Sequence, residues 1–164
     1  MAEIPDAMMR KGRGADGSFN SGELLFRRVP LTLWEDGDDA IEIDAIELPD
    51  MSVLRSKYGH AEWARLERDD FAEWGVVSFA VENIPEELLH EGIFRWEFGP
   101  HHDPLHKNFP HTEVRAFENK VHVNMKLKDR LDPQLHLRWR EQLLRKVRKE
   151  ILPYEEREVP QDAP

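Results

Sequence analysis

Apolar positions along the chain predict an α+β domain built mostly from antiparallel strands. Short apolar blocks, or apolar residues at every second position, occur at residues 24–29, 31–34, 41–48, 76–81, 94–98, 112–117 and 121–127. Asp36-Gly37, between the second and third of these runs, is typical of a tight hairpin turn. We therefore expect one sheet of about six strands.

The helical period predicts two helices. Asp132 is a natural N-cap residue and Pro133 suits the first helical position. An apolar stripe then repeats every four residues, which predicts a long C-terminal amphipathic helix packed on one face of the sheet; it consists of Leu135, Trp139, Leu143, Val147 and Ile151. A second, shorter helix is expected at about residues 59–68, and a helical turn is expected to begin at Pro85.

The two ends of the chain lack an apolar period. Residues 1–22 contain four glycines among small and charged neighbours, and residues 154–164 are similarly polar. Such segments rarely bury enough apolar surface to become ordered. We expect a flexible N-terminal tail over residues 1–22, a single α+β domain over residues 23–153, and a flexible C-terminal tail over residues 154–164.

Charge and composition narrow the set of partners. The net charge of −10 argues against a nucleic-acid binder that relies on bulk charge, although residues 132–152 carry six basic side chains against three acidic ones. Nucleic acid is therefore a possible partner that the net charge does not indicate. No apolar run approaches the ~20 residues needed to span a bilayer, so no membrane partner is expected. The absence of cysteine and of a signal-peptide pattern favours a cytoplasmic protein.

The histidine-rich stretch from His101 to Lys126 holds the most concentrated chemistry. Pro104 and Pro110 predict a loop over residues 101–111, which precedes a hairpin. If Asn119-Lys120 forms the turn, Val114 and Ala116 face Met125 and Val123 to make an apolar side. The opposite side then collects six polar residues: His111, Glu113, Arg115, His122, Asn124 and Lys126.

This polar side has two interpretations, of which the first is acid–base chemistry on a phosphodiester. His111 and Glu113, with a second histidine from His102, His106 or His122, would exchange protons. Cationic and polar groups would bind substrate and stabilise the charge of the transition state; the candidates are Arg115, Lys126, Asn124, Arg55, Lys57 and Tyr58. An ordinary solvated face with a cross-strand pair between Glu113 and Lys126 explains the same pattern.

A metal site is a third interpretation of the loop. No cofactor is predicted, but residues 101–113 supply histidine and carboxylate ligands suited to a divalent metal ion. The loop spacing does not define a ligand geometry, so the identity of any metal and its ligands stays open.

Two functions follow from these observations. The first is a small interaction protein or subunit of a larger assembly, which binds a protein partner or a second copy through charged and aromatic surfaces, including five tryptophans. The alternative is a small phosphodiesterase or ribonuclease based on His and Glu, with its site on the hairpin of residues 111–126. The sequence leaves open whether the protein is an enzyme, and if it is one, a hydrolase is expected.

Overall fold

The computed structural model describes residues 3–35, 40–90, 94–124, 126, 132–153 and 159–160. The strands are β1 (Leu24–Val29), β2 (Met51–Arg55), β3 (Gly75–Ala80), β4 (Glu87–His90), β5 (Phe94–His102), β6 (His111–Glu118), β7 (Val121–Val123) and β8 (Arg148–Ile151). One α-helix, α1 (Pro133–Leu144), lies within the described residues. Six 3₁₀ helices connect these elements: η1 (Asp6–Met8), η2 (Leu31–Leu33), η3 (Ile43–Ala45), η4 (Ala61–Arg65), η5 (Asp69–Glu73) and η6 (Val81–Asn83).

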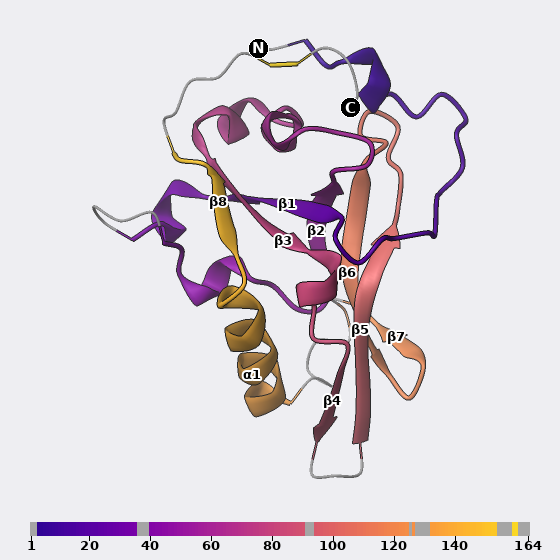
Figure 1. Ribbon diagram of the computed structural model, residues 1–164, viewed down its shortest axis with the longest axis vertical. Helices are drawn as coiled ribbons and strands as arrows, with labels where there is room; N and C mark the ends of the chain where they lie inside the picture. The colour runs from indigo at the N-terminus through magenta and orange to yellow at the C-terminus, as the bar shows by residue number, and fades with distance from the viewer. Residues whose placement is uncertain are drawn as a thin grey trace.

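The strands form one sheet in the order β4-β5-β6-β2-β1-β3-β8, and β7 pairs with the last residues of β6, in its lower part in Figure 1. Every strand pair is antiparallel, which confirms the expected α+β class. Strand β6 is central because β5 pairs along one of its edges, while β2 and β7 divide the other edge between them.

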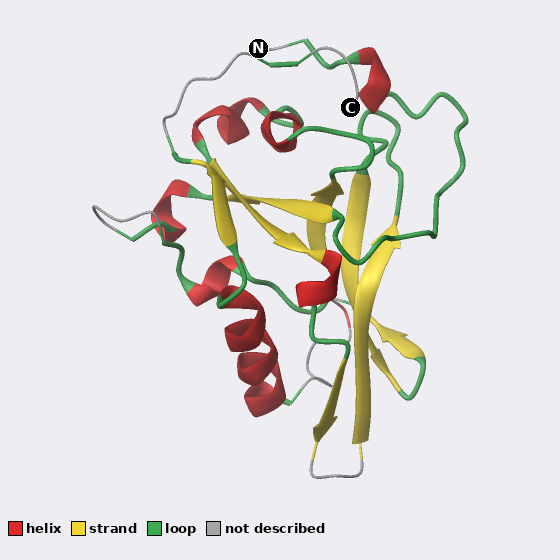
Figure 2. Ribbon diagram, in the orientation of Figure 1, coloured by secondary structure: helices red, strands yellow, loops and turns green. Residues whose placement is uncertain are grey.

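The two faces of the sheet are covered differently. On one face, α1 packs its buried stripe of Leu135, Trp139 and Leu143 into the main core, and the ring of Trp139 lies 5.2 Å from that of Phe98 on β5. Figure 2 shows α1 as the one long helix beside the strands. On the other face, η4 and the N-terminal segment cover β1, β2 and β3 through a second apolar cluster that includes Trp63 and Met8. Among the described residues, the second cluster does not extend over β5, β6 and β7.

The predicted C-terminal helix is too long. Helix α1 begins as expected, since the Asp132 carboxylate accepts the N–H groups of Gln134 and Leu135. It ends at Leu144, however, and β8 then pairs with β3, which buries Ile151 completely beside Val76. Ile151 would be buried either by a further turn of the helix or by a strand that follows α1. Its four-residue spacing from Val147 therefore did not distinguish a longer helix from a strand.

Other local predictions were also wrong. The second helix is a five-residue 3₁₀ helix, although it buries Trp63 as expected. Residues 31–33 are a 3₁₀ helix rather than a strand, and the segment after Pro85 forms strand β4 rather than a helical turn. The proposed turn at Asp36-Gly37 lies outside the described residues, but Trp34 and Ile41 on either side of it form an antiparallel bridge.

The N-terminal residues take a defined path beside the sheet. Met8 is 1% exposed, its carbonyl accepts the Phe109 N–H, and the Arg10 N–H bonds the carbonyl of His106. Residues 10–22 then run past the ends of β5 and β6 before β1 begins (Figure 1). The flexibility that we predicted for residues 1–22 and 154–164 stays a prediction about motion, but residues 3–22 are packed against the domain.

The hairpin prediction is confirmed near its turn. Ala116 pairs with Val123 and Phe117 with His122, and Asn119 and Lys120 have the positive φ angles of 49° and 67° that a two-residue turn of this kind requires. Val114, Ala116 and Val123 are fully buried, while Glu113 and Arg115 are half-buried. The expected alternation between an apolar and a polar side is therefore present on β6.

In the described part of the chain, no helix combines the length and apolarity needed to cross a membrane.

Candidate functional site

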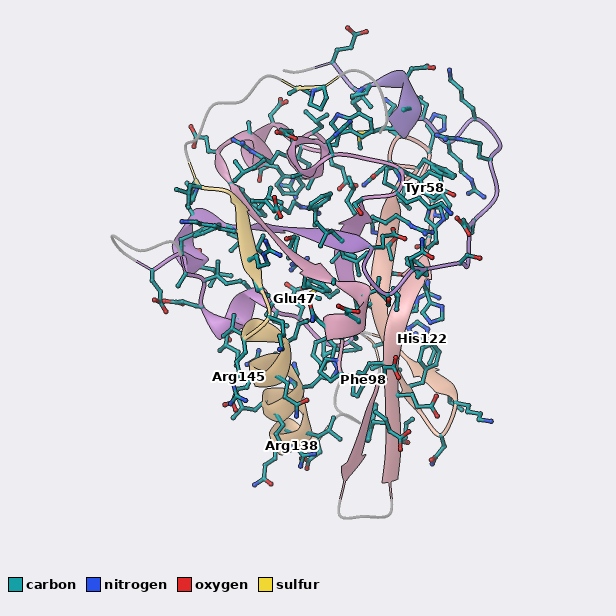
Figure 3. The ribbon with its side chains drawn as sticks, in the orientation of Figure 1. Glu47, Tyr58, Phe98, His122, Arg138 and Arg145 are labelled. Atoms are coloured by element: carbon teal, nitrogen blue, oxygen red, sulfur yellow. The ribbon has the colours of Figure 1, made fainter. Side chains whose placement is uncertain are left out.

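Polar residues gather on the face of β5, β6 and β7 that α1 does not cover. Figure 3 shows His122 on the side of these strands away from Phe98 and from the helix that carries Arg138 and Arg145. Glu113 on β6 pairs directly with Ser52 on β2 and with His101 on β5, so the three side chains form one row across the sheet. We call the following set the histidine face: Asp50, Ser52, His101, His111, Glu113, Arg115 and His122.

His111 is held by hydrogen bonds at both ring nitrogens. Its Nδ1 lies 2.9 Å from the backbone carbonyl of Asp103, and its Nε2 lies 3.2 Å from Ser52 Oγ. A carbonyl can only accept, so Nδ1 carries the hydrogen and the neutral ring presents the Nε2 lone pair to the serine hydroxyl. The Asp103 carboxylate lies 3.9 Å from the same Nδ1. His111 is therefore oriented as a proton acceptor for Ser52.

The other two histidines of the face flank one aromatic ring. The His101 and His122 rings lie 5.1 Å and 5.5 Å from the ring of Phe117. The His122 Nε2 is 2.7 Å from a carboxylate oxygen of Asp50, a residue in the left-handed conformation just before β2. Burial lowers the pKa of His101, and the positive charges of Arg115 and His122 lower it further. His101 is therefore neutral near pH 7 and able to accept a proton.

Arg115 lies between these histidines with one donor unused. Its Nη2 donates to Glu113 Oε1 at 2.8 Å, so the carboxylate orients the guanidinium. Its Nε is buried and has no acceptor within the described structure. Directly opposite Arg115 on β5 is Gly99, where an added Cβ would meet no atom within 4 Å. The open space over Gly99 therefore lies on the same face as Arg115, whose Nε is itself shielded from solvent.

Three predicted substrate-binding residues belong to a different cluster. Arg55 is fully buried and donates to both carboxylate oxygens of Glu23 at 2.8 Å, and to the backbone carbonyls of Asp16 and Ser18 at 2.7 Å. Lys57 and Tyr58 donate to the Asp16 carboxylate at 2.7 and 2.6 Å. We call this set, with His102, the Asp16 clamp. It holds the chain before β1 and engages the donors that we expected to bind phosphate.

The charges within the Asp16 clamp stabilise one another. Hydrogen bonds from Lys57 and then from Tyr58 hold the pKa of Asp16 well below its usual range. The same carboxylate raises the pKa values of Lys57 and Tyr58. These shifts favour the ionised pair and the neutral phenol at physiological pH, so the clamp is an internal contact that is already complete.

His102, predicted as a catalytic residue, also belongs to the Asp16 clamp. Its Nδ1 accepts the Asp16 N–H at 2.8 Å, which leaves Nε2 to donate to the Phe109 carbonyl at 2.7 Å. Its ring stacks on Tyr58, and burial lowers its pKa. Both nitrogens of a neutral imidazole are therefore engaged in holding backbone.

The remaining predicted residues lie outside the histidine face. Strand β7 ends at Val123, so the expected pair of Arg115 with Asn124 is not part of the strand pairing. The expected pair of Glu113 with Lys126 is wrong, because Glu113 pairs with Ser52 on β2 instead. Asn124 accepts the Lys126 N–H, and Lys126 is exposed. His106 is exposed at the tip of the loop. Of the predicted site residues, the face brings together His111, Glu113, Arg115 and His122.

Sequence reasoning did not assign catalytic roles to Ser52, Asp50 and His101. Ser52 and Asp50 reach the face only because β2 pairs with β6, and His101 reaches it because β5 extends past Pro100 into the predicted loop. His101 had a local signal: it precedes two prolines and alternates with Glu97 and Gly99 on one strand. Ser52 and Asp50 had none that is visible without the strand pairing.

Neither a metal-binding cluster nor a similarity to known proteins assigns a role to these residues. Among the described residues, no three His, Asp or Glu side chains lie where they could hold a metal ion together. The divalent metal that we considered at residues 101–113 stays a prediction. Comparison with protein-family models, with curated proteins and with solved structures finds no match to this chain.

Proposed function

We propose that the protein cleaves a phosphodiester bond at the histidine face by side-chain acid–base catalysis. The observation that carries this proposal is Arg115, whose buried Nε has no acceptor and whose strand partner Gly99 leaves open space on the same face. Buried donors almost always have a partner, so an acceptor is expected there. A phosphoryl oxygen suits a guanidinium that Glu113 already holds in place.

The surrounding histidines supply the proton transfers. Cleavage needs a base to take a proton from the attacking oxygen and an acid to protonate the leaving oxygen, and imidazoles exchange protons near neutral pH. His111 presents Nε2 as an acceptor, while His122 is anchored to Asp50 through Nε2. Arg115 would stabilise the negative charge that grows on the phosphoryl oxygens.

The net charge of −10 favours a small substrate over a long nucleic acid. A polyanion is repelled by the protein as a whole, because many phosphates must approach the acidic surface. A short phosphodiester brings only one negative charge to the face, where Arg115 can bind it. We therefore expect a dinucleotide-sized or smaller substrate to be cleaved faster than long RNA.

Protein binding, the first function expected from the sequence, has less support from the structure than phosphodiester cleavage has. Trp34, Trp63, Trp96 and Trp139 are buried in the cores, so these rings are not available as interface anchors. Among the residues that the structure describes, the exposed large apolar ones are Leu105, Val121, Leu137 and Leu152, which come from separate parts of the fold. Binding of a protein partner or of a second copy remains an untested prediction without a specific surface.

The test is hydrolysis of bis(4-nitrophenyl) phosphate and of a labelled RNA, each measured with and without a chelator. We expect the wild type to release 4-nitrophenol, and Arg115→Ala to lower kcat by about 10²–10³, as loss of one transition-state donor does. His111→Asn, which removes the proton acceptor, should also lower kcat, by about 10² or more.

The matched control is His106→Asn, which removes an exposed histidine outside the face and should keep wild-type activity. Far-UV circular dichroism and thermal unfolding would confirm that each variant is folded. Wild-type protein that releases no product from either substrate, or an Arg115→Ala variant with unchanged kcat, would refute the proposed function.

A further inference from the structure

We propose that Ser52 is the nucleophile of the histidine face and that His111 is its general base, so that cleavage passes through a covalent Ser52 phosphodiester intermediate. The choice of a phosphorus substrate rests on the proposed function. The pairing of the two side chains does not, because it is a contact of the fold itself, with Ser52 Oγ 3.2 Å from His111 Nε2.

The surroundings of the pair suit nucleophilic catalysis. A serine hydroxyl is a weak nucleophile unless an adjacent base accepts its proton, and that base needs a third group to fix its tautomer. Here the Asp103 carbonyl accepts the Nδ1 hydrogen of His111, and the Asp103 carboxylate stands 3.9 Å away, where it can stabilise an imidazolium. Asp103 is thus a positioning residue for His111.

The backbone of Ser52 is also fixed by a hydrogen bond. Its carbonyl accepts a hydrogen bond from the buried side chain of Arg27 at 2.9 Å, and Arg27 also donates to the carbonyl of Ala45. Strand β2 is paired on both edges, with β1 and with β6. The hydroxyl is half-buried on a rigid strand, as a nucleophile that must meet the substrate in one geometry should be.

The reaction balances with groups on the face. His111 Nε2 takes the Ser52 hydroxyl proton while the Oγ–P bond forms and the bond from phosphorus to the leaving oxygen breaks; His111 then gives that proton to the leaving oxygen. Water next attacks the phosphorus of the serine ester, His111 accepts a proton from the water, and the Oγ–P bond breaks with return of the proton to Ser52. The net change is one phosphodiester and one water to a phosphomonoester and an alcohol.

A fluorophosphonate tests this nucleophile without any assumption about the natural substrate. Its phosphorus is attacked by an activated serine with loss of fluoride, which leaves a stable adduct that mass spectrometry detects and locates. We expect one adduct, at Ser52, none in Ser52→Ala, and labelling slowed about 10²-fold or more in His111→Asn. His106→Asn is the control that should label like the wild type.

A second variant guards against misfolding of the His111 substitution. The chain has no cysteine, so Ser52→Cys introduces a single thiol beside His111, and Ser21→Cys introduces one on an exposed residue as the matched control. A thiol beside an imidazole is more ionised, and we expect iodoacetamide at pH 6.5 to alkylate the first about tenfold faster than the second.

The outcomes separate the two proposals. Labelling of Ser52 together with no cleavage of phosphodiesters would refute the proposed function and keep the nucleophile. Cleavage that persists in a folded Ser52→Ala variant, absence of an adduct at Ser52, or a Ser52→Cys thiol that reacts no faster than the control would overturn the nucleophile and leave the proposed function standing.

Discussion

The Asp16 clamp and the histidine face are built from the same kinds of residue but differ in how completely these are paired. Each contains an arginine, an acidic partner and at least one histidine. In the clamp, Arg55 has acceptors for Nε and both terminal nitrogens, and His102 is bonded at both ring nitrogens. On the face, Arg115 keeps an unpaired Nε, and its strand partner Gly99 leaves open space.

This difference separates a structural cluster from a candidate reactive one. A donor that already has a full set of internal acceptors would have to break them to bind a ligand, at a cost of about 1–3 kcal/mol or more for each charged hydrogen bond. A donor that lacks an internal acceptor breaks no such bond, so a hydrogen bond to a ligand adds directly to the binding free energy. Residue type alone therefore does not identify the site, whereas the pairing of each polar atom does.

The largest expected effect comes from removing each of the two arginines in turn and comparing the loss of stability. Arg55→Ala leaves the buried carboxylate of Glu23 without its partner and should lower the free energy of unfolding by about 3–5 kcal/mol. Arg115→Ala exposes only the partly solvated Glu113 and should cost about 1 kcal/mol or less. Urea unfolding measures both. Equal destabilisation by the two substitutions would remove the distinction between the clamp and the face.

Filling the space over Gly99 tests whether the histidine face is open for a ligand. Gly99→Val adds a side chain that suits a strand and meets no atom of the protein at Cβ, so the thermal midpoint should stay equal or rise. The same side chain would occupy the space beside Arg115, and KM for bis(4-nitrophenyl) phosphate should increase about tenfold, or 1.4 kcal/mol.

The matched control is Gly99→Ala, which adds the single carbon for which there is room and should shift KM much less. A Gly99→Val variant that is folded and has the KM of the wild type would show that substrate does not approach Arg115 from this side.

The Asp16 clamp should respond to acid through His102. Its pKa is lowered in the folded state, so below about pH 6.5 the unfolded chain takes up a proton before the folded chain does. Stability is therefore complete above that pH and falls as the pH decreases, since protonated Nδ1 can no longer accept the Asp16 N–H. Loss of this hydrogen bond should cost about 1 kcal/mol.

Urea unfolding at pH 7.5 and at pH 5.5 measures the effect. His102→Asn keeps an acceptor without a titrating ring and should reduce the difference between the two pH values, whereas His106→Asn should leave it unchanged. His101 and His136, whose pKa values burial also lowers, contribute with the same sign, so part of the difference should persist. A His102→Asn variant with the full wild-type pH dependence would contradict this assignment.

The smallest expected effect concerns the turn that carries His122. Lys120 has a φ of 67°, a conformation that costs a residue with a side chain more than it costs glycine. Lys120→Gly should stabilise the protein by about 0.5 kcal/mol, measured by urea unfolding, and leave the clamp unaffected. Val121→Gly, next to the turn but in strand β7, is the control that should destabilise.

Local patterns predicted the parts of this fold that depend on neighbours in the chain. The alternation of Val114, Ala116 and Val123 around Asn119-Lys120 was sufficient for the β6–β7 register, because burial of one side and the turn geometry agree. The end of α1 was not predictable, since no glycine or proline stands between Leu144 and Leu152 to end the helix, and the pairing of β8 with β3 decides it.

Long-range pairing accounts for what the sequence left out. The loop that Pro104 and Pro110 indicated begins later than expected, because β5 continues through Pro100 to His102. Strand β4 pairs only with residues 94–97 of β5, so the missing N–H of Pro100 faces an edge where no partner strand needs it. Alternation on β6 was sufficient to place His111 on the polar side, but Ser52 stands in a strand that lacks clean alternation, so its hydrogen bond to His111 could not be predicted. The candidate site was thus predictable on β6 and not on β2.

The division of one edge of β6 between β2 and β7 has a consequence for the order of folding. The turn that joins β6 to β7 is two residues long, whereas Ser52 and His111 are 59 residues apart in the chain, and Asp50 and His122 are 72 apart. Contacts between distant segments close large loops and form slowly. We therefore expect the β6–β7 hairpin to form early and β2 to dock late, so that recovery of activity during refolding would report the last step rather than the first.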